Sequence, residues 1–310
     1  MTNALPPVLG SLSFGFYPRP LAVTAGPVSI EILPDLDKAV ADVVGDEGVE
    51  RDWIYPPLQE VRHLGGGIST RPYPSRIFGL PKTHRIAHSA PDSTDHLIFH
   101  IWVLSFFTGM RLTSTDAGFL DATPIKPGKL VDFVLLRGGV PKAVELAEAF
   151  WVKHRADPRR AHIVAAAIHA LFLGQNPVAL QYERFLSLYT AFDACFALAQ
   201  GMHKPRGRIT HSGRVAWMCG LFGMPIPAWA DPNIPSGPEI ASLRNETVHE
   251  ALFMGEPLGF AIHGVGSSGN LTLEMEALLC RLIVALLGAS ASTYVRTPGN
   301  TRQRQGLDLG

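Results

Sequence analysis

The sequence has little charge and no excess of either sign. Only 17% of its 310 residues are Asp, Glu, Lys or Arg, and 27 basic residues balance 27 acidic ones. Proteins that bind nucleic acid over a wide surface are usually basic, so any contact with RNA has to come from a local patch or from a cleft between two copies. The hydrophobic fraction of 46% is enough for a buried core and excludes a wholly disordered chain.

Cysteines and long apolar runs are also scarce. The three cysteines, Cys195, Cys219 and Cys280, lie far apart in apolar segments, which predicts buried thiols in place of a disulfide framework. The longest apolar runs, 97–107 and 277–287, are too short to cross a bilayer, and the first residues lack the pattern of a secretory signal. We therefore expect a soluble, cytoplasmic protein with no membrane partner.

Hydrophobic periodicity divides the chain into two domains and a tail. Residues 1–138 combine proline- and glycine-rich turns with strand patterns at 28–32 and 129–136 and an apolar helix at 93–110. Residues 139–289 have helical periodicity throughout, and residues 290–310 are expected to form a flexible tail. The predicted fold class is α+β, with a mixed strand and helix region followed by an all-α helical bundle.

Two motifs in the first domain indicate ligand chemistry, but plainer roles fit them better. His96 and His100 have the one-turn spacing of zinc-binding helices, with Asp95 and Asp116 nearby, yet residue 97 is Leu where a metalloprotease helix has Glu. The run 65–67 of three glycines lacks the Lys and Ser or Thr of a phosphate-binding loop. We expect core or capping histidines, a turn at the glycines, and neither a metal ion nor a cofactor.

The most informative segment is SGPEIASLRNETVHEALFMG, residues 236–255. Ser236 and Glu239 have the spacing of a capping box, and a helical stripe predicted to face the core follows, formed by Ile240, Leu243, Thr247 and Ala251. On an α-helix Asn245 and His249 share a face, with Arg244 on the neighbouring flank. The three side chains can converge on an anion such as a phosphate. An arginine followed at this range by a histidine also occurs at 155–162 and 206–211, but an amide follows only Arg244.

The LRNETVHEALF segment resembles the motif of the HEPN superfamily of helical domains, in particular the Apea-like HEPN proteins: an arginine, a polar residue and then a histidine on an amphipathic helix. Residues 182–199, YERFLSLYTAFDACFALA, are similar to the long helix that precedes the motif helix in that family. The resemblance covers roughly the C-terminal half. It implies an HEPN-like bundle and a metal-independent endoribonuclease that cuts single-stranded RNA, in phage defence or as a toxin.

The resemblance also implies catalytic roles for Arg244, Asn245 and His249. The 2′-hydroxyl would attack the phosphate and leave a 2′,3′-cyclic phosphate, and His249 can act as base or acid because an unperturbed histidine titrates near neutrality. One histidine cannot do both, and HEPN nucleases typically place two motifs face to face in a homodimer with a composite active site. The first domain would then be a sensor or specificity region, and an antitoxin or other regulatory partner could control the protein.

The connection 201–214, GMHKPRGRITHSGR, is the most basic stretch of the chain. In a nuclease its side chains would hold the RNA backbone, and otherwise they form a solvated loop; they are Lys204, Arg206, Arg208, His211 and Arg214. Asp193, on the preceding helix, is a candidate for orienting Arg244. The alternative to catalysis is a binding or dimerisation module, in which Arg244 pairs with Glu246, Glu239 or Asp193 and His249 is an ordinary helix histidine.

Overall fold

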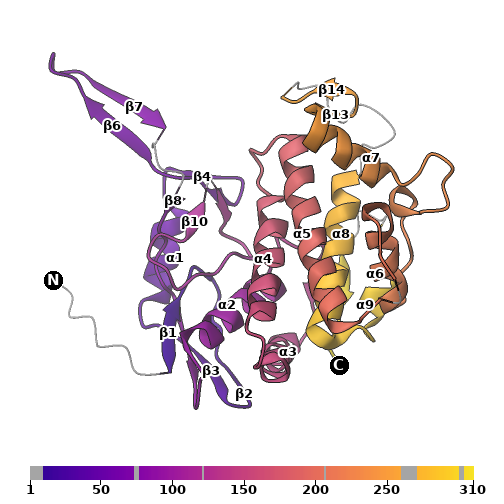
Figure 1. The fold of residues 1–310 in the computed structure, drawn as a ribbon. Coiled ribbons are helices and arrows are strands. Elements are labelled where there is room, and N and C mark those ends of the chain that lie inside the picture. Colours follow the sequence, from indigo (N-terminus) through magenta and orange to yellow (C-terminus); the bar gives the residue numbers. More distant parts are fainter. Residues whose placement is uncertain (1–9, 73–76, 121, 206, 260–270, 300–303) are drawn as a thin grey trace. The chain divides into compact units, whose positions relative to one another are not determined.

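The computed structural model describes residues 10–72, 77–120, 122–205, 207–259, 271–299 and 304–310. The chain divides into two compact units, Met1–Leu130 with Ala143–Glu145, and Val131–Lys142 with Leu146–Gly310. Strands are concentrated in the first unit and helices in the second, so the chain is α+β as its sequence predicts (Figure 1). Within the described part of the chain, no helix has the length and apolar character needed to cross a membrane.

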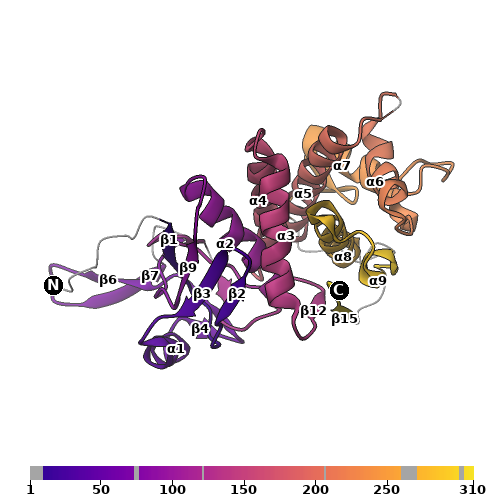
Figure 2. The ribbon, with the colours of Figure 1, turned by 90° about the horizontal axis from the view of Figure 1, so that it is seen from below.

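The N-terminal unit is built on an antiparallel four-stranded sheet with the order β1-β9-β3-β2 (Figure 2). Its strands are β1 (Ser11–Phe14), β9 (His84–His88), β3 (Val28–Ile32) and β2 (Val23–Ala25). The predicted strand at 28–32 is confirmed. Strand β9 was not predicted, because two of its three inward positions are histidines, His84 and His88, where a strand pattern normally has apolar residues.

Helix α2 (Thr94–Thr108) packs on this sheet against β9 and β1. It agrees with the predicted helix at 93–110, and it is buried nearly all round, as its continuous apolar composition indicates. The helix ends at Gly109, whose φ of 61° is the left-handed conformation that glycine adopts without a steric penalty. The chain then turns into the loop that follows α2.

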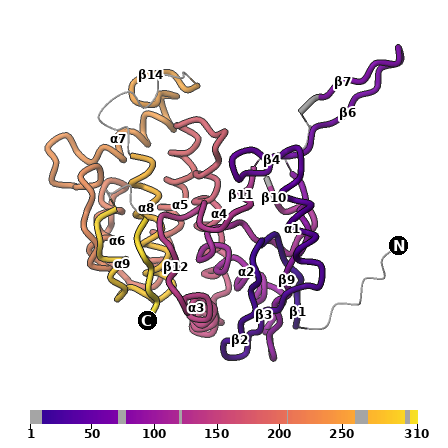
Figure 3. Tube along the Cα trace, turned by 180° about the vertical axis from the view of Figure 1, so that it is seen from behind, coloured from indigo at the N-terminus to yellow at the C-terminus, as the bar shows by residue number. Residues whose placement is uncertain are grey.

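The remainder of the N-terminal unit consists of one helix and short strand pairs. They are α1 (Leu36–Val44), the set β4 (Val49–Glu50), β5 (Trp53–Ile54) and β11 (Thr123–Pro124), the pair β8 (Ile77–Phe78) and β10 (Phe119–Leu120), and the hairpin β6 (Leu58–Arg62) with β7 (Ile68–Pro72). The hairpin extends away from the sheet of its own unit (Figure 3). Its turn contains the three glycines at 65–67, which confirms the predicted turn.

The C-terminal unit is organised around α5 (Gln181–Met202), which packs against α4 (Arg159–Leu173) and α8 (Leu271–Val284). Further helices are α3 (Gly139–His154), α6 (Arg214–Phe222), the motif helix α7 (Glu239–Asn245) and the short helix α9 (Thr293–Arg296). The core face of α5 carries Phe185, Leu188, Phe192 and Cys195, as its periodicity predicts, and all three cysteines are buried and unpaired. Figure 1 shows α4, α5 and α8 running alongside one another.

The C-terminal unit contains strands as well as helices, and one hairpin lies within residues 139–289, which were predicted to be all-α. Strands β13 (Leu252–Phe253) and β14 (Glu256–Pro257) form a hairpin after the motif helix, and β12 (Phe133–Leu135) pairs in parallel with β15 (Gln305–Leu307). The segment 129–136 was predicted as a strand, and β12 lies within it. Its partner was missed because β15 is short and only its last residue, Leu307, is a large apolar one.

The expected flexible tail is instead packed in its described parts. Helix α9 (Thr293–Arg296) buries Tyr294 and Val295, and β15 buries Leu307. Arg281 of α8 is 1% exposed and places Nη1 2.7 Å from Asp132 Oδ2, while the Tyr294 hydroxyl donates to the other oxygen of Asp132. A buried charge of this kind is tolerated because it is paired and hydrogen-bonded, and here it joins the tail to residues near β12.

Candidate functional site

The motif segment forms a helix that buries three of the four residues of the predicted inward face. Ile240, Leu243 and Thr247 are buried, but Ala251 is exposed and stands at the C-cap in the left-handed conformation, with φ of 56°. The capping box predicted from Ser236 and Glu239 does not form: Pro238 is the N-cap residue, and no side chain caps the helix. Proline is suited to this place because the first backbone N–H groups of a helix have no partner within the helix.

The second half of the motif is wound as a π-helix, η3 (Glu246–Glu250). Within it, the Thr247 hydroxyl donates to the Leu243 carbonyl at 2.6 Å, a bond of the kind that bends helices. In a π turn residues five apart stack on one face, whereas in an α-helix residues four apart do so. Arg244, near the end of α7, and His249, in the π turn, are five residues apart, and their side chains are in contact.

Arg244 is the centre of the motif. Its Nη1 lies 2.8 Å from His249 Nε2 and 3.2 Å from Asn245 Oδ1. Asn245 Oδ1 and His249 Nε2 therefore both contact the same atom of Arg244, and no described hydrogen bond joins the amide directly to the imidazole. Arg244 is half-buried, while Asn245 and His249 are exposed, so the group is open to solvent.

The chemistry of the guanidinium determines which partner donates in the contact between Arg244 and His249. A guanidinium group has donors and no acceptor, so in this contact Arg244 donates and His249 Nε2 accepts. Among the described residues, none of the acidic partners considered for Arg244, namely Glu246, Glu239 and Asp193, forms an ion pair with it. The described side-chain contacts of the guanidinium are with uncharged groups of its own turn, which leaves its charge available to an anion.

Asp193 binds Arg214 in place of Arg244. Its Oδ1 lies 2.6 Å from Arg214 Nη1, and the Arg214 guanidinium lies 4.8 Å above the centre of the Phe196 ring. Arg214 Nη2 in turn lies 3.3 Å from His211 Nε2. Arg214 and His211 were predicted to contact RNA from a loop, whereas Arg214 begins helix α6 and is held by α5.

Electrostatic effects link this group to the motif. Loss of hydration, Arg214 and Arg244 lower the pKa of His211, against the opposing effect of Asp193. Burial and Asp193 raise the pKa of Tyr189 on α5, while Arg214 and Arg244 oppose the rise. Because Arg244 acts on both residues, α5, α6 with its preceding turn, and the motif helix contribute to one charged cluster.

The rest of the basic connection is less constrained. Lys204 and Arg208 are exposed, and none of the described interactions joins either of them to Arg244 or His249. Arg206 lies outside the described residues. The structure therefore brings His211 and Arg214 into the cluster and leaves Lys204 and Arg208 as solvated cations.

The histidines of the N-terminal unit form a separate buried cluster. The ring centres of His96 and His100 are 5.2 Å apart, and His88 of β9 lies 4.6 Å from His96. Sequence spacing could not reveal His88, because it comes from a strand next to α2. The Nδ1 atoms of His88 and His96 accept backbone N–H groups from Ala90 and Asp92.

Those bonds bear on metal binding. A ligating histidine normally donates its second ring N–H, but a neutral ring that accepts at Nδ1 carries its proton on Nε2. Asp116, considered as a further ligand, binds Lys82 Nζ at 2.6 Å. The arrangement favours capping and core roles for these side chains over a metal site.

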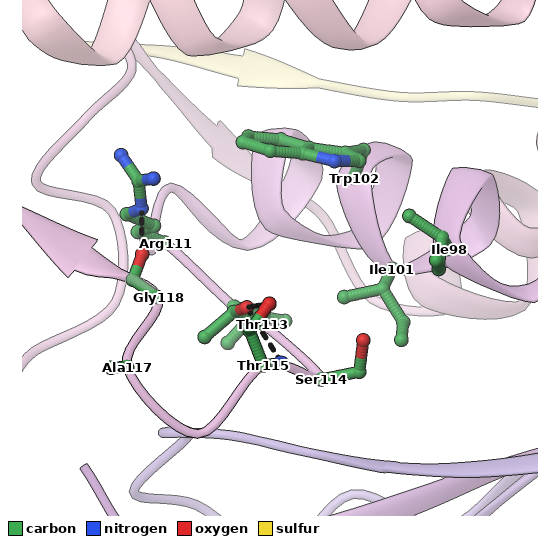
Figure 4. A pocket seen from close by; sticks show the side chains of 10 residues that line it. Ile98, Ile101, Trp102, Arg111, Thr113, Ser114, Thr115, Ala117 and Gly118 are labelled. Carbon is green, nitrogen blue, oxygen red and sulfur yellow. Dashed lines mark hydrogen bonds between the residues drawn. The ribbon is translucent and has the colours of Figure 1, made fainter. Parts of the chain in front are cut away.

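A cavity of about 260 Å³ in the N-terminal unit was not predicted. It is lined by Ile98, Ile101 and Trp102 of α2 and by the loop 111–118 (Figure 4). Arg111 Nε donates to the Gly118 carbonyl at 3.0 Å, and burial lowers the pKa of Arg111 to about 10. No sequence motif marks the loop, since the cavity arises from the way it folds back beneath α2.

No protein-family model, no curated protein and no solved structure matches the chain. Within the chain itself, the group best suited to chemistry is the exposed one formed by Arg244, Asn245 and His249, where a cation, an amide and an imidazole are in contact.

Proposed function

We propose that this chain is a metal-independent endoribonuclease of the HEPN type, which cleaves single-stranded RNA at the group Arg244, Asn245 and His249. The observation that carries the proposal is the 2.8 Å contact between Arg244 Nη1, near the end of α7, and Nε2 of the exposed His249 in the π turn. A permanent cation and a side chain of the type that titrates near neutrality are thus in contact where a polymer can reach them. The resemblance of this segment to HEPN motifs supports the same class.

Each side chain has a role in this chemistry. The Arg244 guanidinium offers a planar set of donors to two phosphate oxygens and stabilises the negative charge that grows on them. His249 transfers a proton, and Asn245, 3.2 Å from the guanidinium, orients it or the phosphate. The 2′-oxygen attacks phosphorus, the bond to the 5′-oxygen breaks, and the products are a 2′,3′-cyclic phosphate and a 5′-hydroxyl.

Substrate binding would change the partner of Arg244. In the free protein its Nη1 bonds the His249 lone pair, so the imidazole cannot accept another proton there. A phosphate oxygen is a stronger acceptor because it is charged, and it draws the guanidinium away from the ring. The lone pair is then released as the phosphate arrives, which couples proton transfer to substrate binding.

The charges around the motif are suited to binding a short stretch of RNA. Lys204 and Arg208 are exposed cations that can follow the RNA backbone, while the chain as a whole has no net charge. In this proposal the N-terminal unit is a sensor or specificity region, the protein works as a homodimer, and an antitoxin or other partner controls it. A role in phage defence or as a toxin is part of the same proposal and rests on the same resemblance.

The test is cleavage of end-labelled single-stranded RNA in excess EDTA by the parent protein, Arg244→Ala and His249→Ala. Arg159→Ala and His203→Ala are matched controls, because both residues are exposed in the same unit. We expect cyclic phosphate ends from the parent and the controls, and a loss of about 100-fold or more in each motif variant. Equal cleavage by the motif variants would refute the site.

One observation favours a non-catalytic module as the alternative. The described side-chain contacts of Arg244 lie within its own turn, so the motif can also serve to close the end of a helix. In that case the parent leaves RNA intact, and Arg244→Ala lowers the melting temperature without changing any activity. Thermal unfolding of the same variants therefore separates the two functions.

A further inference from the structure

Cleavage through the 2′-hydroxyl needs two proton transfers, and the motif has a single histidine. A base removes the proton of the 2′-hydroxyl, and an acid gives one to the departing 5′-oxygen. The sequence led us to expect the second group from another copy of the chain. The charged cluster around Arg244, however, contains a second histidine of the same chain, His211.

His211 is held in place by surrounding structure. It begins the short turn η1 (His211–Gly213), which packs against the motif helix α7 and leads directly into α6. Its Nε2 lies 3.3 Å from Arg214 Nη2, and Arg214 is fixed by Asp193 at 2.6 Å and by the face of Phe196. Although the imidazole is exposed, its orientation is determined by a partly buried and paired arginine.

The two histidines are held in the same way. Arg244 donates to Nε2 of His249, and Arg214 donates to Nε2 of His211. Since a guanidinium can only donate, both imidazoles accept at Nε2 and carry their proton on Nδ1. The cluster therefore contains two arginine–histidine pairs, one from the motif helix and one from the start of α6.

We propose that His211 is the second catalytic histidine of the ribonuclease site and that it works with His249 of the same chain, with Arg214 as its positioning residue. This inference rests on the proposed function. His211 accepts the 2′-hydroxyl proton, the 2′-oxygen bonds to phosphorus, and the bond from phosphorus to the 5′-oxygen breaks. Once Arg244 turns to the phosphate, His249 Nε2 takes up a proton from solvent and gives it to that oxygen. The two histidines thus end with their protonation states exchanged, and no metal ion or redox partner takes part.

The charges around His211 support its role as the base. Loss of hydration, Arg214 and Arg244 favour its neutral form, while Asp193 opposes them; Tyr189 is the further titratable group of the cluster. A base has to be unprotonated when the substrate binds, and a lowered pKa of His211 favours that form. The role of acid then falls to His249, which is next to the arginine that binds the phosphate.

The test uses His211→Gln, because the glutamine amide oxygen still accepts from Arg214 but cannot transfer protons at neutral pH. Single-turnover cleavage of RNA in EDTA is measured from pH 5 to pH 9 for the parent, His211→Gln, His249→Gln and the control His203→Gln. We expect a loss of about 100- to 10,000-fold in the first two variants and parental rates in the control. His211→Gln should also lose the rise in rate with pH on the acidic side of the profile.

Mixing His211→Gln with His249→Gln distinguishes a pair within one chain from a pair shared between copies. If both histidines act within one chain, every chain in the mixture lacks one of them and cleavage is not restored. Restored cleavage would overturn the inference, because it would place the two groups on different chains. Parental rates from His211→Gln would overturn it as well, while inactive His249→Gln would leave the nuclease proposal standing. If the parent protein leaves RNA intact, both the nuclease proposal and the role of His211 are refuted.

Discussion

Arg244 and His249 are five residues apart and in contact, and the backbone that carries His249, from Glu246 to Glu250, is wound as a π-helix. The sequence identified these residues and their chemistry from an arginine, an amide and a histidine in a capped amphipathic segment. From α-helical periodicity it predicted that Asn245 and His249 share a face, with Arg244 on the neighbouring flank. The buried positions Ile240, Leu243 and Thr247 fit either winding, so hydrophobic spacing could not reveal the π turn.

The roles of Asp193 and His211 illustrate a second limit of sequence reasoning. Asp193 was expected near Arg244 from the order of the helices, yet it binds Arg214 at 2.6 Å. His211 was grouped with the loop cations because it lies among them in the sequence. The contacts between side chains of α5, α6 and the motif helix depend on how each helix is rotated and packed. No pattern in a single sequence predicts that rotation.

His84 gives the protein a pH dependence that can be measured. Its side chain is 0% exposed in the central strand of the N-terminal sheet, and burial lowers its pKa to about 4. The native state keeps the imidazole neutral, whereas the unfolded chain protonates it below about pH 6.5. The unfolded state therefore binds more protons in this window, and the free energy of unfolding falls as the pH drops from about 6.5 to about 4.

We expect this histidine to remove at most about 3 kcal/mol of stability over that window, since one pKa unit corresponds to about 1.4 kcal/mol. Urea unfolding at pH 7 and pH 4.5 measures the difference, with His84→Leu as the variant that lacks the titrating group. His63→Leu, in the exposed turn of the β6–β7 hairpin, is the control. An equally steep loss of stability in His84→Leu would show that other groups cause it.

At the level of whole elements, long segments with clear periodicity were predicted and short or polar ones were not. Helices α2, α4 and α5 and strand β3 agree with their hydrophobic patterns. Among the missed strands, β9 has histidines at inward positions and β15 has one buried apolar residue, Leu307, and both are stabilised by partners distant in the sequence. Pairing with a distant strand determines whether such segments form strands, because their local β-propensity is weak.

The end of the motif helix carries a testable strain. Ala251 has φ of 56°, a conformation that costs a residue with a Cβ atom roughly 1–2 kcal/mol and costs glycine little. We expect Ala251→Gly to raise the free energy of unfolding by about 0.5–1 kcal/mol, once the greater freedom of glycine in the unfolded chain is included. Ala241→Gly, inside α7, should lower it by about 1 kcal/mol.

Thermal and urea unfolding of the two glycine variants measure the difference directly. Both substitutions remove one methyl group, so opposite signs isolate the backbone conformation as the cause. If both variants are destabilised, the left-handed turn after the motif is not strained in solution. Cleavage by Ala251→Gly should equal that of the parent, because Arg244 and His249 lie on the N-terminal side of the cap.

For the molecule as a whole, no sequence pattern indicates how the C-terminal residues are used. Residues 290–310 have the composition of a polar tail, yet Tyr294, Val295 and Leu307 are buried. The reason lies in a contact across 149 positions of the chain, between Arg281 of α8 and Asp132. An arginine inside an apolar helix interrupts the hydrophobic run, and its burial requires an acidic partner that the sequence alone does not identify.

This network yields the last prediction. Arg281→Met keeps the apolar stem but leaves the Asp132 carboxylate, with a side chain 19% exposed, without its cation. Removing one partner of a buried ion pair typically costs about 3–5 kcal/mol, because the other charge stays desolvated. The exposed Arg296→Met should change the stability by less than about 0.5 kcal/mol.

Urea unfolding compares the two variants, and amide hydrogen exchange at Gln305–Leu307 reports on the pairing of β15 with β12. Faster exchange there in Arg281→Met alone would show that the buried pair holds the tail in place. The double variant Arg281→Met with Asp132→Leu should regain part of the loss, since replacing a whole buried pair with apolar groups is often neutral. Equal costs for Arg281→Met and Arg296→Met would mean that apolar packing of Tyr294, Val295 and Leu307 is sufficient to hold these residues in the fold.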